Sequence, residues 1–266
     1  MGSFEDAKLW SAIGRRDASL LRKALAGGAN PNAKGHKTLY GQETVLQVAA
    51  QQVDEVAIEL LLAAGARQTP GRHKETPLIA LALALSTVST PEDEDRFLKA
   101  LDLLLAKKPN LEPEGGDSSR STGNAVFHVI RQPLSPFVER VEARFFEVMS
   151  KKKKFSDDFS ASVLLGAFNF RHPTVFERLV DIGLDPQSLK DYALGPGARI
   201  VMGMKTEDIE AWWPVLAAHN VPVGNKGEVK SPMVESAIDQ AQAKQTALRM
   251  EWSMDKAAPT VPRPRF

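Results

Sequence analysis

Residues 41–68 read GQETVLQVAAQQVDEVAIELLLAAGARQ and carry the strongest structural pattern in the chain. Thr44 stands at a helix N-cap position, and Leu46, Ala49 and Ala50 follow it with the spacing of one helix face. A second helical pattern ends in a glycine stop, with its apolar and closing positions at Val56, Leu60, Leu61, Gly65 and Ala66. The stretch therefore predicts an inner helix and an outer helix joined by a short turn.

The same pattern recurs on both sides of this stretch. The triplet Thr76-Pro77-Leu78 repeats the opening, 32 residues after Thr44. At the other end of the pattern, Gly28 precedes Gly65 by 37 residues. A threonine caps the first helix, a proline suits its first turn, and the alanines allow successive helices to stack closely. We therefore predict three repeated units before residue 110.

These openings, together with the closing Gly28-Ala29-Asn30, resemble the ankyrin repeat, whose signature is a Thr-Pro-Leu-His opening and a Gly-Ala-Asp closing on a period of about 33 residues. The resemblance implies an all-α fold, an ankyrin-repeat solenoid of six to seven helix-turn-helix units with hairpin loops and degenerate C-terminal units. The expected units lie near residues 5–40, 41–73, 74–122, 123–157, 158–187, 188–226 and 227–253 of a single domain, 1–255, before a disordered Pro-rich tail, 256–266.

The later units depart further from the repeat signature. Gly123 to His128 mimics the opening and retains its His, for which the resemblance implies a structural hydrogen-bonding role between repeats. Residues 189–202 are expected to hold an inner helix, and a last helix is expected to run to about Ser253. Two insertions interrupt the pattern: 86–96 predicts an acidic loop or a helix N-terminus, and 109–122 predicts an elongated loop.

Composition narrows the function classes. The chain has 34 Lys and Arg against 33 Asp and Glu, so its net charge of +1 gives no general attraction to nucleic acid. It has no cysteine, which excludes disulfides, thiolate nucleophiles and Cys-ligated metal sites. No leader peptide and no apolar stretch long enough to span a bilayer is visible, so a cytoplasmic location is the default expectation.

No pattern in the sequence anchors catalysis, and we expect no enzyme activity, no cofactor and no metal. His36 and His73 are 37 residues apart, one repeat, but neighbouring repeats stack at about 8–10 Å, too far for shared coordination. Gly197 to Thr206 approaches a phosphate-binding loop, but five residues rather than four separate its glycines and Met204 precedes Lys205. A loop between degenerate helices is the favoured interpretation.

Two further features have both a structural and a binding interpretation. The run Lys151 to Lys154 fits a solvated turn, or a contact with an acidic partner, a phosphate backbone or a membrane, and Phe155 after it is a candidate exposed apolar residue. Trp212 and Trp213 fit core filling, or a contact surface if one of them is partly exposed.

Ankyrin repeats bind other proteins through a concave face of inner helices and hairpins, so the resemblance implies a protein–protein interaction module. A bacterial inhibitor, an immunity protein or an adaptor is the expected role, with a monomer as default and neither nucleic acid nor membrane as partner. The expected partner-binding residues are Arg15, Arg16, Lys34, His36, Lys37, Tyr40, Gln51, Gln52, Arg67, Arg72, His73 and Lys74. Their cations predict a partner with an acidic patch.

Two alternatives to this function stay open. One is a secreted effector that targets host proteins, and the other is a small nucleotide-binding or transferase activity in the divergent region 188–230.

Overall fold

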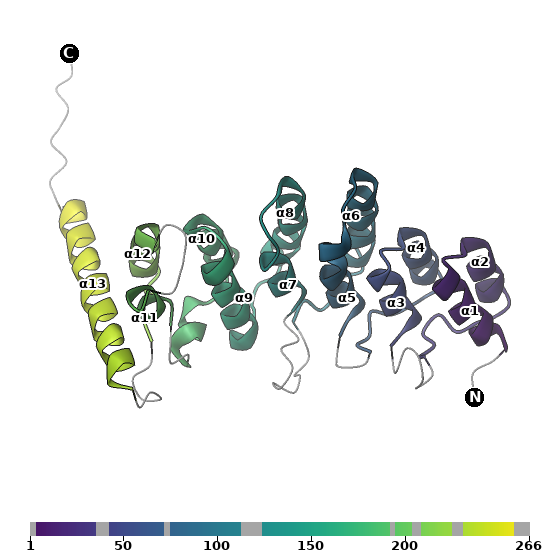
Figure 1. The fold of residues 1–266 in the computed structure, drawn as a ribbon, viewed down its shortest axis with the longest axis horizontal. Coiled ribbons are helices and arrows are strands. Elements are labelled where there is room, and N and C mark those ends of the chain that lie inside the picture. The colour runs from purple at the N-terminus through teal and green to yellow at the C-terminus, as the bar shows by residue number, and fades with distance from the viewer. Residues whose placement is uncertain are drawn as a thin grey trace, which may run out of the picture. The chain divides into compact units, whose positions relative to one another are not determined.

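The computed structural model describes residues 4–35, 43–71, 75–112, 124–191, 195–203, 209–224 and 231–257. Over these ranges the chain is all-α, as predicted, with one isolated β-bridge between Lys34 and Thr44 (Figure 1). No helix among the described residues is long and apolar enough to cross a membrane. The chain divides into two compact units, Met1–Lys152 and Lys153–Phe266.

The first unit is a stack of helix pairs. Its described pairs are α1 (Phe4–Arg15) with α2 (Ala18–Ala26), α3 (Val45–Gln51) with α4 (Glu55–Ala63), α5 (Pro77–Ala84) with α6 (Pro91–Leu105), and α7 (Ala125–Ile130) with α8 (Pro136–Ser150); a 3₁₀ helix, Leu85–Thr87, follows α5. The first helices contact one another in the order α1, α3, α5, α7, and the second helices in the order α2, α4, α6, α8. The stack therefore has two layers, an inner one and an outer one (Figure 1).

Side-chain caps determine where the inner helices begin. Thr44, Thr76 and Asn124 each accept a hydrogen bond from the backbone N–H three residues later, at 3.1, 3.2 and 2.9 Å respectively. All three caps are buried, so they satisfy donors that water would not reach. The helix starts predicted at Thr44 and Thr76 are confirmed.

Left-handed residues determine where the first two inner helices end. Arg16 and Val53 have φ angles of 52° and 53°. The residue after each of them donates its backbone N–H to an oxygen of the preceding helix: Asp17 to Ala12 in α1, and Asp54 to Ala49 in α3. Gly28 and Gly65 end α2 and α4 in the same way, with φ angles of 89° and 90°. The glycine stops are confirmed, and the same turns recur 37 residues apart.

The core of this unit lies between its two layers. Ala49, Ala50 and Ala80 are fully buried and permit the close approach of α3 and α5. In the outer layer, the rings of Phe97 and Phe137 meet edge to face at 5.6 Å. His128 is buried in α7, and its hydrogen-bonding role between repeats stays a prediction.

The second unit contains α9 (Asp157–Phe170), α10 (Pro173–Ile182), the 3₁₀ helix Pro186–Asp191, α11 (Pro196–Val201), α12 (Ile209–Ala218) and α13 (Pro232–Ala257). α9 packs on α10, α10 packs on α12, and α13 packs on both α11 and α12. Trp212 lies at the centre of its core, with its ring centroid 4.9 Å from that of Phe168 and 5.6 Å from that of Phe176.

Several predicted boundaries change. The insertion 86–96 contains the start of α6, so the helix N-terminus is confirmed, with three carboxylates in the first turn. A helix expected within 189–202 is present but shorter, because Pro196 begins α11, which ends at Val201, and the preceding Gly195 is in an extended conformation. The helix expected to stop near Ser253, with the tail from 256, continues to Ala257.

Residues 113–122 and 258–266 lie outside the described residues, and one continuous solenoid stays a prediction.

The left-handed conformation of Val53 predicts an unusual gain in stability. A β-branched side chain is strained there, so Val53→Gly should raise the free energy of unfolding by about 0.5–1 kcal/mol, measured by urea denaturation. The control is Val56→Gly, inside α4 and similarly half-buried, which should lower it by about 0.5–1 kcal/mol. A loss of stability in both variants would contradict the prediction.

Candidate functional site

The structure describes half of the residues predicted to bind a partner. His36, Lys37, Tyr40, Arg72, His73 and Lys74 lie outside the described residues. Of the others, Arg15, Arg16, Gln51 and Gln52 lie at the ends of α1 and α3, whereas Lys34 and Arg67 follow the ends of α2 and α4. Their role in binding stays a prediction, but their positions can be compared.

One pair of these residues is brought together. The Arg16 guanidinium donates to the backbone oxygen of Gln52 at 2.8 Å, which joins the ends of two neighbouring inner helices. Lys34 and Arg67 do not join this pair, because α1 and α2 are linked by two residues and run antiparallel. The nine residues of α2 place its two ends about 14 Å apart. The predicted cations therefore form two groups at opposite ends of the helix pairs.

The group at the outer-helix ends is part of a continuous row. The Asn32 side chain donates to the Gly65 oxygen at 3.2 Å and accepts from the Arg67 N–H at 2.8 Å. The Gln68 side chain then donates to the Leu104 oxygen at 2.7 Å. These bonds connect the C-terminal ends of α2, α4 and α6, so residues that follow those ends lie along one edge.

Four exposed cations follow those ends, and we call them the cationic edge: Lys34, Arg67, Lys107 and Lys108. Lys107 and Lys108 are not among the residues predicted to bind a partner. Their position directly after an outer helix, like that of Arg67 after α4, was the signal that could have found them. Lys108 also has a left-handed backbone, with a φ of 50°, at the end of α6.

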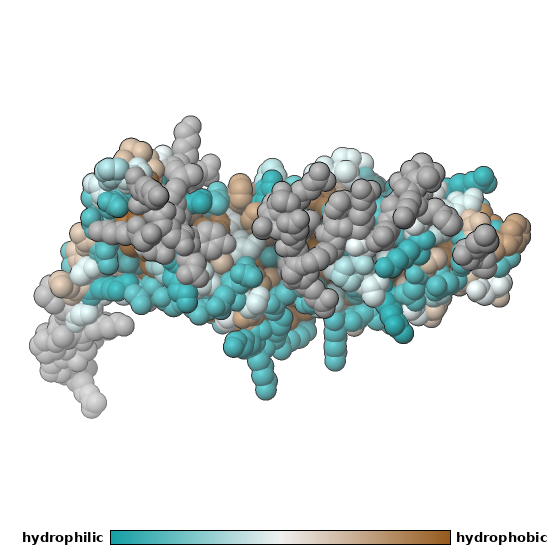
Figure 2. All heavy atoms as spheres, turned by 90° about the horizontal axis from the view of Figure 1, so that it is seen from below, coloured by the Kyte–Doolittle hydropathy of each residue, from teal (hydrophilic) through white to brown (hydrophobic). Residues whose placement is uncertain are grey.

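Ion pairing distinguishes this edge from the outer faces of α6 and α8. On those faces Arg140 contacts Glu94 at 2.5 Å, and Arg144 contacts Asp102 at 2.7 Å, each across neighbouring helices. By contrast, no described carboxylate lies within ion-pair distance of any of the four edge cations. Figure 2 shows that hydrophilic residues cover most of the described part of the face seen from below. Among the described residues, the edge therefore carries positive charge that no carboxylate neutralises.

The first two lysines of the run have carboxylate partners, whereas Lys153 and Lys154 are exposed, so the binding interpretation of the run stays a prediction. Lys151 donates to Glu147 at 2.7 Å, one helical turn away, and thereby holds the pKa of that carboxyl below its usual value. Lys152 pairs with Glu112, and the boundary between the two units falls after it. The expectation that Phe155 is exposed is wrong, because its ring is buried and stacks on Phe159 at 5.3 Å.

The adjacent tryptophans both belong to the core of the second unit. Trp212 is fully buried, and Trp213 is 3% exposed, with the Lys244 ammonium 4.9 Å from its ring centroid. Core filling therefore accounts for both, and the alternative of a partly exposed contact residue is wrong. The Lys244 side chain from α13 therefore covers the Trp213 ring.

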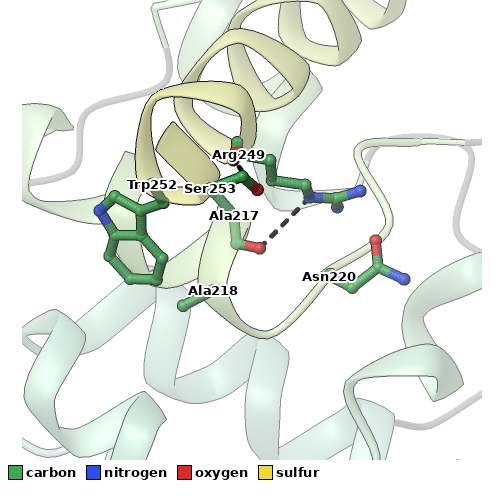
Figure 3. Close-up of a pocket in the computed structure, with 6 residues that line it drawn as sticks. All are labelled: Ala217, Ala218, Asn220, Arg249, Trp252 and Ser253. Carbon is green, nitrogen blue, oxygen red and sulfur yellow. Dashed lines mark hydrogen bonds between the residues drawn. The ribbon is translucent and has the colours of Figure 1, made fainter. Parts of the chain in front are cut away.

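The second unit has a hollow of about 380 Å³ at the end of α12 (Figure 3). It is lined by Ala217, Ala218, Asn220, Arg249, Trp252 and Ser253. Gln245 of α13 fixes this helix end, because its amide nitrogen donates to the Leu216 oxygen at 2.6 Å and to the Val221 oxygen at 2.9 Å. The Arg249 Nε donates to the Ala217 oxygen at 3.3 Å.

The glycine of the phosphate-loop-like segment has a packing explanation. Gly197 lies inside α11, and a Cβ there would come within 2.8 Å of the Val223 side chain. Lys205 and Thr206 lie outside the described residues. Among the residues that are described, no three His, Asp or Glu side chains are grouped to hold a metal ion.

The chain matches no protein-family model and no curated protein. The likeness to ankyrin repeats therefore stays a prediction from the motifs quoted above. Two surface features of the described residues are candidates for binding, the cationic edge of the first unit and the hollow of the second.

The double hydrogen bond from Gln245 predicts a large effect on the second unit. Gln245→Leu removes both donors at a buried helix end and should lower the free energy of unfolding by about 1–3 kcal/mol. Tryptophan fluorescence in urea, measured in a Trp10→Phe background because Trp10 lies in the first unit, reports on this unit through Trp212, Trp213 and Trp252. The exposed neighbour provides the control, and Gln242→Leu should change stability by less than about 0.5 kcal/mol. Equal effects of the two substitutions would contradict the assignment.

Proposed function

We propose that the chain is a non-catalytic protein-binding module of the ankyrin-repeat type, which holds an acidic partner protein as an inhibitor, an immunity protein or an adaptor. The single observation that carries the proposal is the contrast in ion pairing. Cations on the outer faces of α6 and α8 have carboxylate partners across helices, whereas Lys34, Arg67, Lys107 and Lys108 have none among the described residues.

The repeated geometry of the first unit supports the ankyrin-repeat type. Capped inner helices recur after 32 residues, and the left-handed links and glycine stops recur after 37, which brackets the period of about 33 that the resemblance implies. Inner helices pack on inner helices and outer helices on outer helices, so each repeat contacts its neighbours. Such a stack presents the same position of successive repeats in a row, which suits recognition of an extended partner.

The chemistry of the edge favours an acidic surface over an apolar one. Its cations are exposed. Arg67, Lys107 and Lys108 follow helix ends whose carbonyls carry about half a negative charge, whereas Lys34 lies farther along the chain, in a β-bridge with Thr44. The charges of these side chains exceed the half charge of each helix end, so the edge keeps a net positive charge. Exposed charges of this kind accelerate association and select the partner, and they contribute less to affinity. Salt at about 0.5 M should weaken such an interaction strongly.

Charge reversal tests the proposal. The full chain would be used to capture proteins from a lysate of its native cells, beside the triple variant Arg67→Glu, Lys107→Glu and Lys108→Glu. A stoichiometric partner should be captured by the wild type and lost with the variant. With the purified partner, we expect the association rate constant of the variant to be at least about tenfold lower at 50 mM salt, and the difference to shrink at 500 mM.

A matched variant tests whether the loss of binding depends on the position of the charges or only on the net charge of the protein. Arg22→Glu, Arg96→Glu and Lys99→Glu change the same number of charges on exposed helix faces away from the edge. This variant should retain the partner, with an association rate within about threefold of the wild type. If the two triple variants lose the partner equally while both stay folded by circular dichroism, the edge is not the binding site.

A further inference from the structure

We propose that the hollow between the end of α12 and the last turns of α13 binds an apolar, ring-bearing group that carries a carboxylate. The proposal rests on the second unit alone, so its failure would leave the protein-binding role of the first unit untouched. In Figure 3, Trp252 stands on one side of the hollow, Arg249 and Asn220 on the other, and Ala217 and Ala218 between them.

The apolar side of the hollow is a consequence of unequal helix lengths. α13 packs through a stripe that includes Val234, Ile238, Ala241 and Gln245, and Trp252 continues that stripe two turns beyond Gln245. α12 ends at Ala218, before it could cover this last turn. The Trp252 ring is consequently 45% exposed. No other described aromatic ring or cation contacts it, so one face of a large apolar surface is available.

The polar side offers donors. Only the Nε of Arg249 is engaged, with the Ala217 oxygen, and within the described residues its two terminal nitrogens have no hydrogen bond or ion pair. Asn220 lies beside it and is held in a left-handed conformation, with a φ of 53°. A guanidinium presents its terminal N–H groups as a fork that matches a carboxylate.

The sign of the local charge decides the class of ligand. The C-terminal end of α12 contributes about half a negative charge, which by itself favours a cation. However, Gln245 already donates to the Leu216 and Val221 oxygens, and Arg249 donates to the Ala217 oxygen. The full charge of Arg249 then exceeds the remaining dipole. The hollow is therefore positive on the side away from Trp252, and an anion fits it better than a cation.

The ligand has two possible sources with the same chemistry. One is a free aromatic acid or the terminal carboxylate of a peptide that ends in an aromatic residue. The other is an acidic side chain that follows an aromatic residue inside a partner chain. N-acetylphenylalanine represents the first source, and the peptide N-acetyl-Phe-Glu-amide represents the second. The probe that binds with the lower Kd identifies the source of the ligand.

The indole N–H of Trp252 provides a direct readout in ¹H–¹⁵N correlation spectra of the full chain, assigned with Trp252→Phe. Titration with N-acetylphenylalanine should move this signal to saturation with a Kd of about 1 mM, as expected for a small fragment. N-acetylphenylalaninamide has the same ring without the carboxylate and should bind at least about tenfold more weakly. Acetate, which lacks the ring, should also bind at least about tenfold more weakly.

Variants assign the two halves of the hollow. Arg249→Gln should reduce the affinity for N-acetylphenylalanine to that of the amide and leave the affinity for the amide unchanged, and Arg249→Lys should recover part of the loss. Met250→Ala is the matched control, since Met250 is exposed on another face of α13, and it should change neither affinity. The unchanged Trp213 indole signal would show that each variant keeps its core. Equal affinity for the acid and the amide, or a Trp252 signal that stays in place, would overturn the proposal.

Discussion

The fold depends on interactions that stabilise very short helices, namely side-chain caps at their N-termini and packing against neighbouring helices. α3 has seven residues and α7 has six, and helices of that length are not stable alone in water. Each is capped by a buried side chain, Thr44 or Asn124, and packs on α5. Because a helix is stable only when its neighbours are in place, the stack forms as a unit, and the residues that follow helix ends keep fixed positions relative to one another.

The stacking of the helices explains why some charged side chains of the first unit form ion pairs and others do not. Outer helices lie side by side, so charged residues on their faces meet across the contact, as Arg144 meets Asp102. Residues beyond the helix ends meet backbone oxygens and amide side chains instead, as Gln68 meets the Leu104 oxygen. Cations at those ends stay without a described carboxylate. A net charge of +1 conceals this difference, because it sums the paired and the unpaired groups.

The second unit shows how a difference in helix length creates a site. α12 ends at Ala218, where Asn220 takes a left-handed conformation, whereas α13 continues for 26 residues. Gln245 satisfies the end of α12, and in the turns of α13 beyond it Arg249 contacts α12 through the Ala217 oxygen, whereas the Trp252 side chain stays 45% exposed. The result is a hollow with an exposed indole on one side and a guanidinium on the other. Neither residue is unusual in the sequence, and only their juxtaposition at a helix end makes them a candidate site.

The sequence by itself determined the all-α class, the caps at Thr44 and Thr76 and the glycine stops, because these follow from the local chemistry of a few neighbouring residues. It also placed Arg67 after an outer helix. Tertiary structure alone decided that Phe155 and both tryptophans are buried, that Arg16 lies apart from Arg67, and that Lys107 and Lys108 join the row begun at Asn32. Periodicity predicts which face of a helix is apolar, but which helix covers it, and how far, depends on contacts between residues distant along the chain.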